Sequence, residues 1–468
     1  MLLPYIGMTM DFKKIAMLGA IGALFSAQIV AAPTEEEISR LGNDLTPIGA
    51  IKAGNADGTI PAWDGGVCTP PADYKPIMGA RGGSPYADLF PNEKPLFSIT
   101  SANLDQYKDK LDLGTLELFK RNPDTFRVDV YPTHRTACFP NWVYENTIER
   151  VRNPKLVGNA PGLVDAHAQV PFPIPKNGYE AMWNSNVKFD IVNSEGTQEV
   201  WLIDSGGGKT LTTVQKIENR NLYWDNSAQS VPDNQPYWAL IAIVTKPASS
   251  AGEKQLRHAF LNTEKRDPMA WSYVPGQRRV RLAPEFKYDT VSASSGGVLL
   301  FDEINGFDGK MDKYDFKIVG RKEMYVPYNA YKEWAAGIDE LGTPNHLNPD
   351  YLRWELHRVW VVEGTLKPGE RHVHKVKTFL LDEDSWNIVA YYGLDHADKV
   401  HHLMYQPPIQ SYEKPAPRNG HYILYDMSKN AYAVGSMLGS PKMTGFYKVD
   451  SYSSSHFTPG AMAGSGLR

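Results

Sequence analysis

The chain has 468 residues, of which 42% are hydrophobic and 22% are charged. These proportions are ordinary for a globular protein with a buried core. The formal net charge is -4, so no basic excess indicates a nucleic-acid partner. Beyond the N-terminus, no apolar stretch approaches the length that spans a membrane.

The first 32 residues have the pattern of a bacterial signal peptide. Two lysines precede an apolar run over residues 15–30, and small residues follow up to Ala32. We expect cleavage after Ala32, with Ala31 as a second candidate; an uncleaved membrane anchor is the competing interpretation. The mature protein is then predicted to be periplasmic. Thr34 is expected to cap a short helix that begins with three glutamates.

Residues 33–158 are rich in Pro, Gly and Asn and predict an irregular N-terminal part of the mature chain. It contains the two cysteines of the chain, Cys68 and Cys138. In an oxidising compartment such a pair favours one disulfide, whereas a metal or redox pair would need closer spacing. We also expect a helix within Leu104–Phe119 and a strand at Phe126–Tyr131.

The stretch Trp271–Leu282 predicts a hairpin with a tight corner at Pro275-Gly276, because proline fixes φ and glycine accepts a positive φ. Its side chains alternate between two faces. An aromatic pair lies on the first strand and a basic pair on the second: Trp271 and Tyr273, then Arg279 and Arg281. Such a hairpin suits a molecule with an apolar body and a polar or anionic head. The alternative is an exposed basic hairpin whose aromatic side chains pack in the core.

Two further strand patterns follow. Tyr351–Glu363 alternates, with Trp354, Leu356 and Trp360 on a dry face and charged residues on a wet one. Val376–Tyr392 predicts a second hairpin with an acidic turn.

Residues 159–468 as a whole predict a curved antiparallel sheet, since strand patterns are many and strong helix patterns few. Tyr237–Val244 is apolar on both faces and should be buried on both sides. A helix at Tyr328–Glu340 is expected to plug the open side of a closed or half-closed barrel. The alternative is a plain β-sandwich without a cavity.

Motifs for catalysis or metal binding are weak. His372 and His374 share a strand face, and Asp395 or His396 is a candidate third ligand. An H-x-H pair alone is weak evidence for a metal, so solvated strand histidines are the favoured interpretation. Asp302–Asp315 lacks the alternating oxygens of a calcium loop and is interpreted as a polar turn. No nucleophile elbow, P-loop or dinucleotide fingerprint is present, so the sequence indicates no cofactor.

Several stretches, in order along the chain, resemble a bacterial family known as domain of unknown function 1329, which belongs with the outer-membrane lipoprotein-sorting carriers of the LolA/LolB type. They are Trp271–Leu282, Phe301–Tyr314, Lys317–Glu323 and Phe379–Trp386. The resemblance spans most of the mature chain. It implies a mainly β (α+β) fold, an unclosed antiparallel β-barrel wrapped around a few helices, with a hydrophobic cavity for acyl or similar chains. It also implies genes that accompany an outer-membrane β-barrel protein and an exporter of the resistance-nodulation-division class.

This chain is much larger than the small lipoprotein carriers, which leaves its cargo open. We therefore predict a single domain over residues 33–468 that acts as a non-enzymatic periplasmic carrier or chaperone for a lipid or similar hydrophobic molecule. It would pass this cargo between inner-membrane export machinery and the outer membrane. The residues predicted to bind the ligand are Trp271, Tyr273, Arg279, Arg281, Trp354, Leu356 and Trp360. The alternatives are a periplasmic hydrolase of lipids, esters or glycans, and a structural envelope component without a ligand.

Overall fold

The computed structural model describes residues 32–72, 74, 88–159, 161–412, 415–437 and 445–464. The predicted signal peptide lies outside these ranges apart from its last residue, Ala32. Within them, no helix is both long and apolar enough to cross a membrane.

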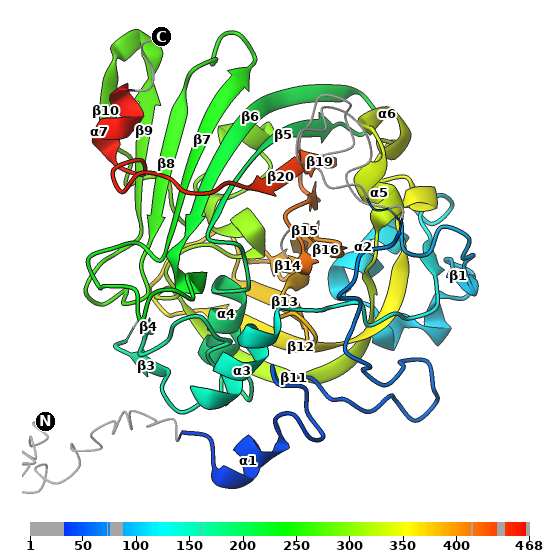
Figure 1. Cartoon of the computed structure of the whole chain (residues 1–468). Coiled ribbons are helices and arrows are strands. Elements are labelled where there is room, and N and C mark those ends of the chain that lie inside the picture. Colours follow the sequence, from blue (N-terminus) through cyan, green and yellow to red (C-terminus); the bar gives the residue numbers. More distant parts are fainter. Residues whose placement is uncertain are drawn as a thin grey trace, which may run out of the picture. The chain divides into compact units, whose positions relative to one another are not determined.

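One sheet of 16 strands organises the chain from Pro33 onward (Figure 1). In the order in which they pair, the strands of its main path are β1 (Phe97–Ile99), β2 (Val128–Val130), β12 (Trp354–Leu366), β13 (Val376–Asp382), β14 (Ile388–Leu394), β15 (Val400–Tyr405), β18 (Tyr422–Asp426), β19 (Ala431–Met437), β5 (Asn193–Ile203), β6 (Lys209–Asn221), β7 (Trp238–Lys246), β8 (Lys254–Ala259), β9 (Met269–Val274) and β10 (Arg279–Leu282). Two more strands join the path from its sides, β11 (Tyr314–Pro327) on β12 and β20 (Gly445–Lys448) on β5. Among the described strands β1 and β10 do not pair with each other, so the barrel is unclosed, as predicted.

Neighbouring strands are antiparallel except β2 and β12, which meet in parallel at a single residue pair. Two small ladders lie apart from the sheet: β3 (Lys155–Val157) with β4 (Gly162–Val164), and β16 (Ile409–Ser411) with β17 (Ala416–Arg418). The irregular N-terminal part therefore contributes β1 and β2 to one end of the sheet.

The helices are short: α1 (Glu35–Arg40), α2 (Leu113–Arg121), α3 (Asn141–Glu149), α4 (Gly178–Asn186), α5 (Tyr331–Ala335), α6 (Ile338–Leu341) and α7 (Pro459–Gly464). Thr34 caps α1 as predicted, and its hydroxyl accepts from the backbone N–H of Glu37 in a capping box. The helix predicted from Leu104 is wrong in its first half, which forms 3-10 turns. The α-helix begins only after Asp112, whose carboxylate accepts from the N–H of Thr115.

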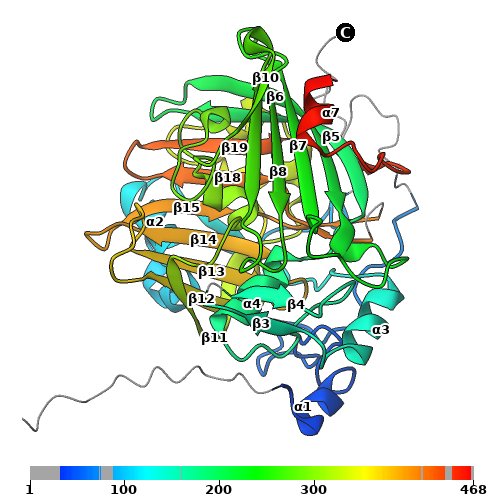
Figure 2. The ribbon, with the colours of Figure 1, turned by 90° about the vertical axis from the view of Figure 1, so that its left-hand side faces the viewer.

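The two faces of the sheet carry separate cores because side chains alternate along each strand. The concave face packs around the segment that contains two 3-10 turns, η5 (Ala293–Ser295) and η6 (Phe301–Gly306), which lies inside the curve of the sheet (Figures 1 and 2). Phe379, Met404 and Leu424 belong to this core. The outer face packs against α2, α5 and α6, and Leu380 and Leu403 belong to that core.

The helix predicted at Tyr328–Glu340 is therefore wrong in both form and place. It is divided into α5 and α6 at Ala336-Gly337, and Trp334 and Leu341 pack in the outer core rather than plugging the open side. The helix α7 covers β8 to β10 on the outer face through Met462, and Phe457, just before the helix, packs in the same cluster.

Three predictions about strand surroundings also need correction. In β7, Trp238 and Leu240 are only half-buried, so the strand is not buried on both sides. In β12, the predicted wet face is dry, since Glu355 and His357 are 0% and 1% exposed. In the hairpin β9–β10, the residue with positive φ is Arg278, at 49°, and Gly276 is not among the residues with positive φ.

Ion pairs within β12 and beside it explain the dry polar face, since Glu355 lies 2.5 Å from the Arg353 guanidinium and 3.0 Å from His357 Nε2. The acidic turn next to this strand is buried in the same way. Arg135, from the N-terminal part, lies 2.6 Å from Asp384 in the acidic turn between β13 and β14. Arg358 of β12 lies 3.2 Å from Glu383 in the same turn. The predicted hairpin is thus confirmed, but its acidic turn is buried against arginines. Nearby, the predicted disulfide between Cys68 and Cys138 is confirmed and ties two parts of the N-terminal segment together.

Candidate functional site

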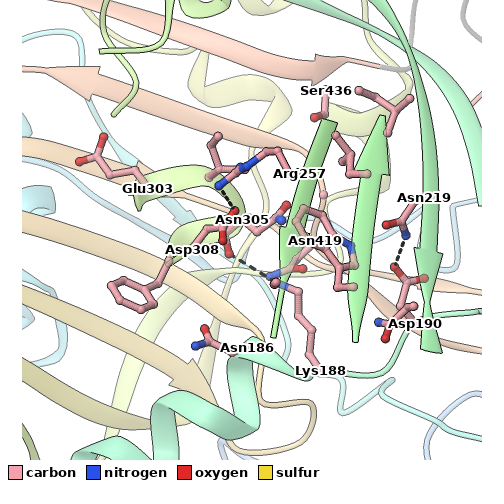
Figure 3. A pocket seen from close by; sticks show the side chains of 18 of the residues that line it. Asn186, Lys188, Asp190, Asn219, Arg257, Glu303, Asn305, Asp308, Asn419 and Ser436 are labelled. Atoms are coloured by element: carbon pink, nitrogen blue, oxygen red, sulfur yellow. Dashed lines mark hydrogen bonds and ion pairs between the residues drawn. The ribbon is translucent and has the colours of Figure 1, made fainter. Parts of the chain in front are cut away.

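A cavity of about 260 Å³ opens on the concave face, between strands β5 to β8 and the η6 segment (Figure 3). The end of α4 and residues 417–420 complete its wall. The larger apolar side chains of the lining include Trp183, Phe189, Val200, Ile217, Trp238, Leu240, Phe307 and Tyr422. Amide and hydroxyl side chains include Asn186, Ser194, Gln198, Gln215, Asn219, Asn221, Gln255, Asn305, Asn419 and Ser436. The predicted hydrophobic hollow therefore exists on this face, but its lining is mixed rather than uniformly apolar.

Charged side chains in the cavity are already paired. The Arg257 guanidinium lies 2.6 Å from the Asp308 carboxylate, and Lys188 Nζ donates to the backbone carbonyl of Asn305 at 3.4 Å (Figure 3). Burial raises the pKa of Asp308, and the neighbouring Arg257 opposes this rise. A guest does not have to supply charge to satisfy these groups.

One edge of the cavity is formed by Glu303 of η6, whose carboxylate pairs with His402 of β15. His402 Nδ1 donates to Glu303 Oε1 at 2.8 Å, and His402 Nε2 faces Asp426 at 3.6 Å. Burial alone would lower the pKa of His402, but the two carboxylates outweigh it and raise the pKa to about 9. His402 is therefore a buried cation held between two anions.

The other histidines of this region form a chain of contacts behind the cavity edge. The Tyr391 hydroxyl lies 2.9 Å from His374 Nδ1, and His374 Nε2 lies 2.9 Å from His401 Nδ1. Burial lowers the pKa of His374 well below its usual value, and the nearby cations add to this effect. His374 is therefore neutral, and a neutral imidazole can donate through one nitrogen and accept through the other.

The two histidines predicted to be solvated are instead buried. His372 Nε2 lies 3.0 Å from the Asp302 carboxylate, and His396, a candidate third ligand, lies 2.8 Å from the backbone carbonyl of His372. Ligand atoms of His374, His401 and His402 lie within 4.8 Å of one another, which is close enough for a shared transition metal. Yet hydrogen bonds and ion pairs within the protein already engage these imidazoles, so the geometry does not require one. Asp302, at the start of the stretch interpreted as a polar turn, is also buried.

None of the residues predicted to bind ligand is among those that line the cavity. Trp271 and Tyr273 pack on the opposite face of the sheet beneath α7. Arg279 and Arg281 are exposed on β10, at the end of the sheet.

The predicted wall residues of β12 are divided between the two cores. Trp354 and Leu356 are buried in the outer core. Trp360 packs against the concave core, where it stacks on Trp386 with ring centroids 5.9 Å apart and the Arg321 guanidinium lies over its ring.

Sequence reasoning missed the lining contributed by β6 and η6. One face of β6 reads Gln215, Ile217, Asn219 and Asn221, which mixes amides with an apolar side chain. This mixture is unusual for a strand that faces either a dry core or bulk water. It is the feature of the sequence from which the contribution of β6 to the cavity could have been predicted. The contribution of Glu303 had no local signal, since the cavity side of η6 depends on contacts with distant strands.

A second, more open cavity of about 730 Å³ lies near β3 and β4. Its rim is mainly polar and charged, with Arg150, Lys155 and Lys265 among its residues. Such a rim offers little apolar surface to a hydrophobic guest, so the concave-face cavity is the better candidate site.

The comparisons with known proteins identify the family. The family model described as "Protein of unknown function (DUF1329)" matches residues 98–463. The chain belongs to the DUF1329 family. A relative of this DUF1329 protein, the uncharacterized protein PA3922 of Pseudomonas aeruginosa, is 37% identical over 454 residues, which cover 95% of this chain and 97% of the relative.

Similar solved structures are more distant. A DUF1329 family protein from Desulfovibrio piger is 12% identical, with a TM-score of 0.42, and the match covers 61% of this chain and 97% of that one. The LolA superfamily protein NE2245 from Nitrosomonas europaea is 10% identical, with a TM-score of 0.35, and the match covers 61% and 98%. A domain from Vibrio parahaemolyticus assigned to outer membrane lipoprotein sorting is 11% identical, with a TM-score of 0.42, and the match covers 61% and 98%.

Proposed function

We propose that this DUF1329 protein is a periplasmic carrier that holds the apolar part of a lipid-like molecule in the concave-face cavity. The observation that carries the proposal is the cavity itself, which lies on the inner face of an unclosed sheet and has an apolar wall beside a polar one. A guest bound there would present both an apolar and a polar part.

Apolar burial supplies the affinity. Each square ångström of apolar surface removed from water contributes about 25 cal/mol to the binding free energy. The entropy that is lost on association opposes this contribution. Trp238 and Leu240 are half-buried on β7, so a guest can cover them further. The cavity volume of about 260 Å³ lies near the lower end of ligand pockets, which span roughly 300 to 1,000 Å³. The proposed cargo therefore places one compact portion inside the cavity, with the remainder emerging from the open sheet.

The disulfide supports the periplasmic location, because such bonds persist in oxidising compartments. We propose that the carrier passes its cargo between two membrane partners. The inner-membrane partner is an exporter of the resistance-nodulation-division class, and the outer-membrane partner is a β-barrel protein. Release would follow when a partner or a membrane competes for the cargo.

The full-length protein tests this proposal by titration with the uncharged apolar dye N-phenyl-1-naphthylamine, followed by displacement of the dye with single-chain lipids. We expect saturable binding with one site and competition by lipid. Non-saturable dye uptake, or dye that no lipid displaces, would overturn the carrier proposal.

A periplasmic hydrolase is the second candidate, and the observation that favours it is the Glu303 carboxylate at the cavity edge beside a histidine. Turnover of a fluorogenic long-chain ester by the wild-type protein, abolished in Glu303→Gln, would establish hydrolysis. Binding of the ester without turnover supports the carrier.

A further inference from the structure

Three asparagine side chains in the cavity have carbonyl oxygens with no hydrogen-bond donor in the part of the chain that the structure describes. They are Asn186 at the end of α4, and Asn219 and Asn221 on β6. Asn219 and Asn221 are two residues apart on one strand, so they face the same side of the sheet. Their side chains are almost entirely buried, with 6% and 5% of each residue exposed.

The orientation of one of these amides is fixed by its surroundings. Asn219 Nδ2 donates to the Asp190 carboxylate and to Ser194 Oγ, each at 3.4 Å (Figure 3). An ionised carboxylate only accepts hydrogen bonds, so the NH₂ end of the amide must face Asp190. The carbonyl oxygen of Asn219 is consequently the end left without a donor.

The charged groups around these amides do not supply the missing donors. Arg257 is engaged by Asp308, and Lys188 donates to the Asn305 carbonyl. The unmet requirement of this wall is therefore for hydrogen-bond donors, which an anionic head does not supply. Buried acceptors without donors are costly and are rare in native proteins, so a bound group or ordered water normally satisfies them.

We propose that the cavity selects cargo whose polar end carries hydroxyl groups, with an apolar chain attached. Hydroxyls can donate to the asparagine carbonyls, while the chain covers Trp238 and Leu240 on the adjoining wall. An ester head offers only acceptors, and a phosphate monoester is mostly doubly ionised above its second pKa of about 6, so their oxygens would face carbonyl oxygens and leave them unpaired. This inference rests on the proposed carrier function and adds the chemical class of the cargo to it.

The test compares three ligands with the same twelve-carbon chain in displacement of N-phenyl-1-naphthylamine from the full-length protein. Monolaurin carries hydroxyls beside its ester, methyl laurate carries the same ester without hydroxyls, and dodecyl phosphate carries an anionic head. We expect monolaurin to displace the dye at about tenfold lower concentration than either of the other ligands. A factor of this size corresponds to one hydrogen bond that monolaurin forms with the protein and the other ligands do not.

Two variants locate the preference. Asn221→Leu keeps a side chain of similar size and removes the acceptor, and should reduce the tenfold preference to about threefold or less. Asn186→Leu, at a half-buried position, should act in the same direction if Asn221→Leu does not fold. The matched control is Asn234→Leu, at an exposed loop position outside the cavity, which should leave the preference unchanged. Thermal unfolding followed by circular dichroism establishes that each variant is folded.

The outcomes separate the two proposals. Equal displacement by all three ligands, or a preference for dodecyl phosphate, overturns the hydroxyl inference and leaves the carrier function standing. The hydroxyl inference is also overturned if the wild type and a folded Asn221→Leu prefer monolaurin to the same degree. Failure of every ligand to displace the dye overturns the carrier function, and the inference falls with it.

Discussion

Replacing Leu240 by asparagine tests whether the cavity binds an apolar group. Leu240 lies half-buried on the cavity side of β7, so the amide of Leu240→Asn can remain hydrated in the free protein. Because part of the leucine is already buried in the free protein, a guest that covers the rest adds roughly half of the 1.5 to 3 kcal/mol of full burial, about 1 kcal/mol. The asparagine instead loses about 1 to 3 kcal/mol in desolvation of its amide. Together these differences amount to roughly 3 kcal/mol, which is about a hundredfold weaker binding.

Fluorescence titration with N-phenyl-1-naphthylamine measures this effect on the full-length protein. The matched control is Leu282→Asn on β10, where the leucine is 53% exposed and lies outside the cavity. We expect the control to bind the dye as the wild type does. If Leu240→Asn binds within about twofold of the wild type, or if Leu282→Asn weakens binding as much, the apolar wall of this cavity is not the binding surface.

Three further predictions concern the framework around the site. Cys68→Ser opens a disulfide that joins residues 70 apart in sequence, and should lower the free energy of unfolding by about 4 kcal/mol. Urea denaturation measures this loss. A loss below about 1 kcal/mol would mean that the disulfide does not restrain the unfolded chain. In His402→Gln the protein should lose roughly 3 kcal/mol near pH 6, because the folded pKa is raised from 6.5 to about 9. This stabilisation is fully present below about pH 6.5 and is lost as the pH rises through 9, so the stability curves of wild type and variant should converge in alkali; parallel curves would refute the assignment. Trp354→Ala should cost about 3 to 5 kcal/mol of stability, since the indole is 1% exposed in the outer core, and should leave dye affinity unchanged. Weaker dye binding by folded Trp354→Ala would instead support the sequence-based assignment of this residue to the ligand.

Elements that depend on neighbouring residues could be predicted from the sequence. The cap at Thr34 needs only the glutamate three residues later, and the β9–β10 hairpin needs only its alternation and a corner. The turn between β13 and β14 shows the limit of this reasoning. Its acidic residues were recognised, but their burial depends on Arg135, which is 249 residues from Asp384 in sequence.

The candidate site was harder to predict because it is assembled from distant segments. Trp354 and Leu356 are predicted as wall residues because they are large, apolar and share a strand face, but these properties are equally typical of a packed core, where both residues lie. The cavity lies instead where β6 and β7 meet η6 and the end of α4. No alternation rule specifies which of two apolar faces is covered by a helix and which remains hollow.

Native mass spectrometry of the full-length protein, purified from the periplasm of its own host, tests the central claim most directly. We predict a non-covalent adduct of lipid-like mass that is released by organic extraction and is strongly reduced in folded Leu240→Asn, but retained in Leu282→Asn. A wild-type protein that carries no adduct and acquires none from a lipid extract would contradict the account. An adduct equally abundant in both variants would place the guest elsewhere on the molecule.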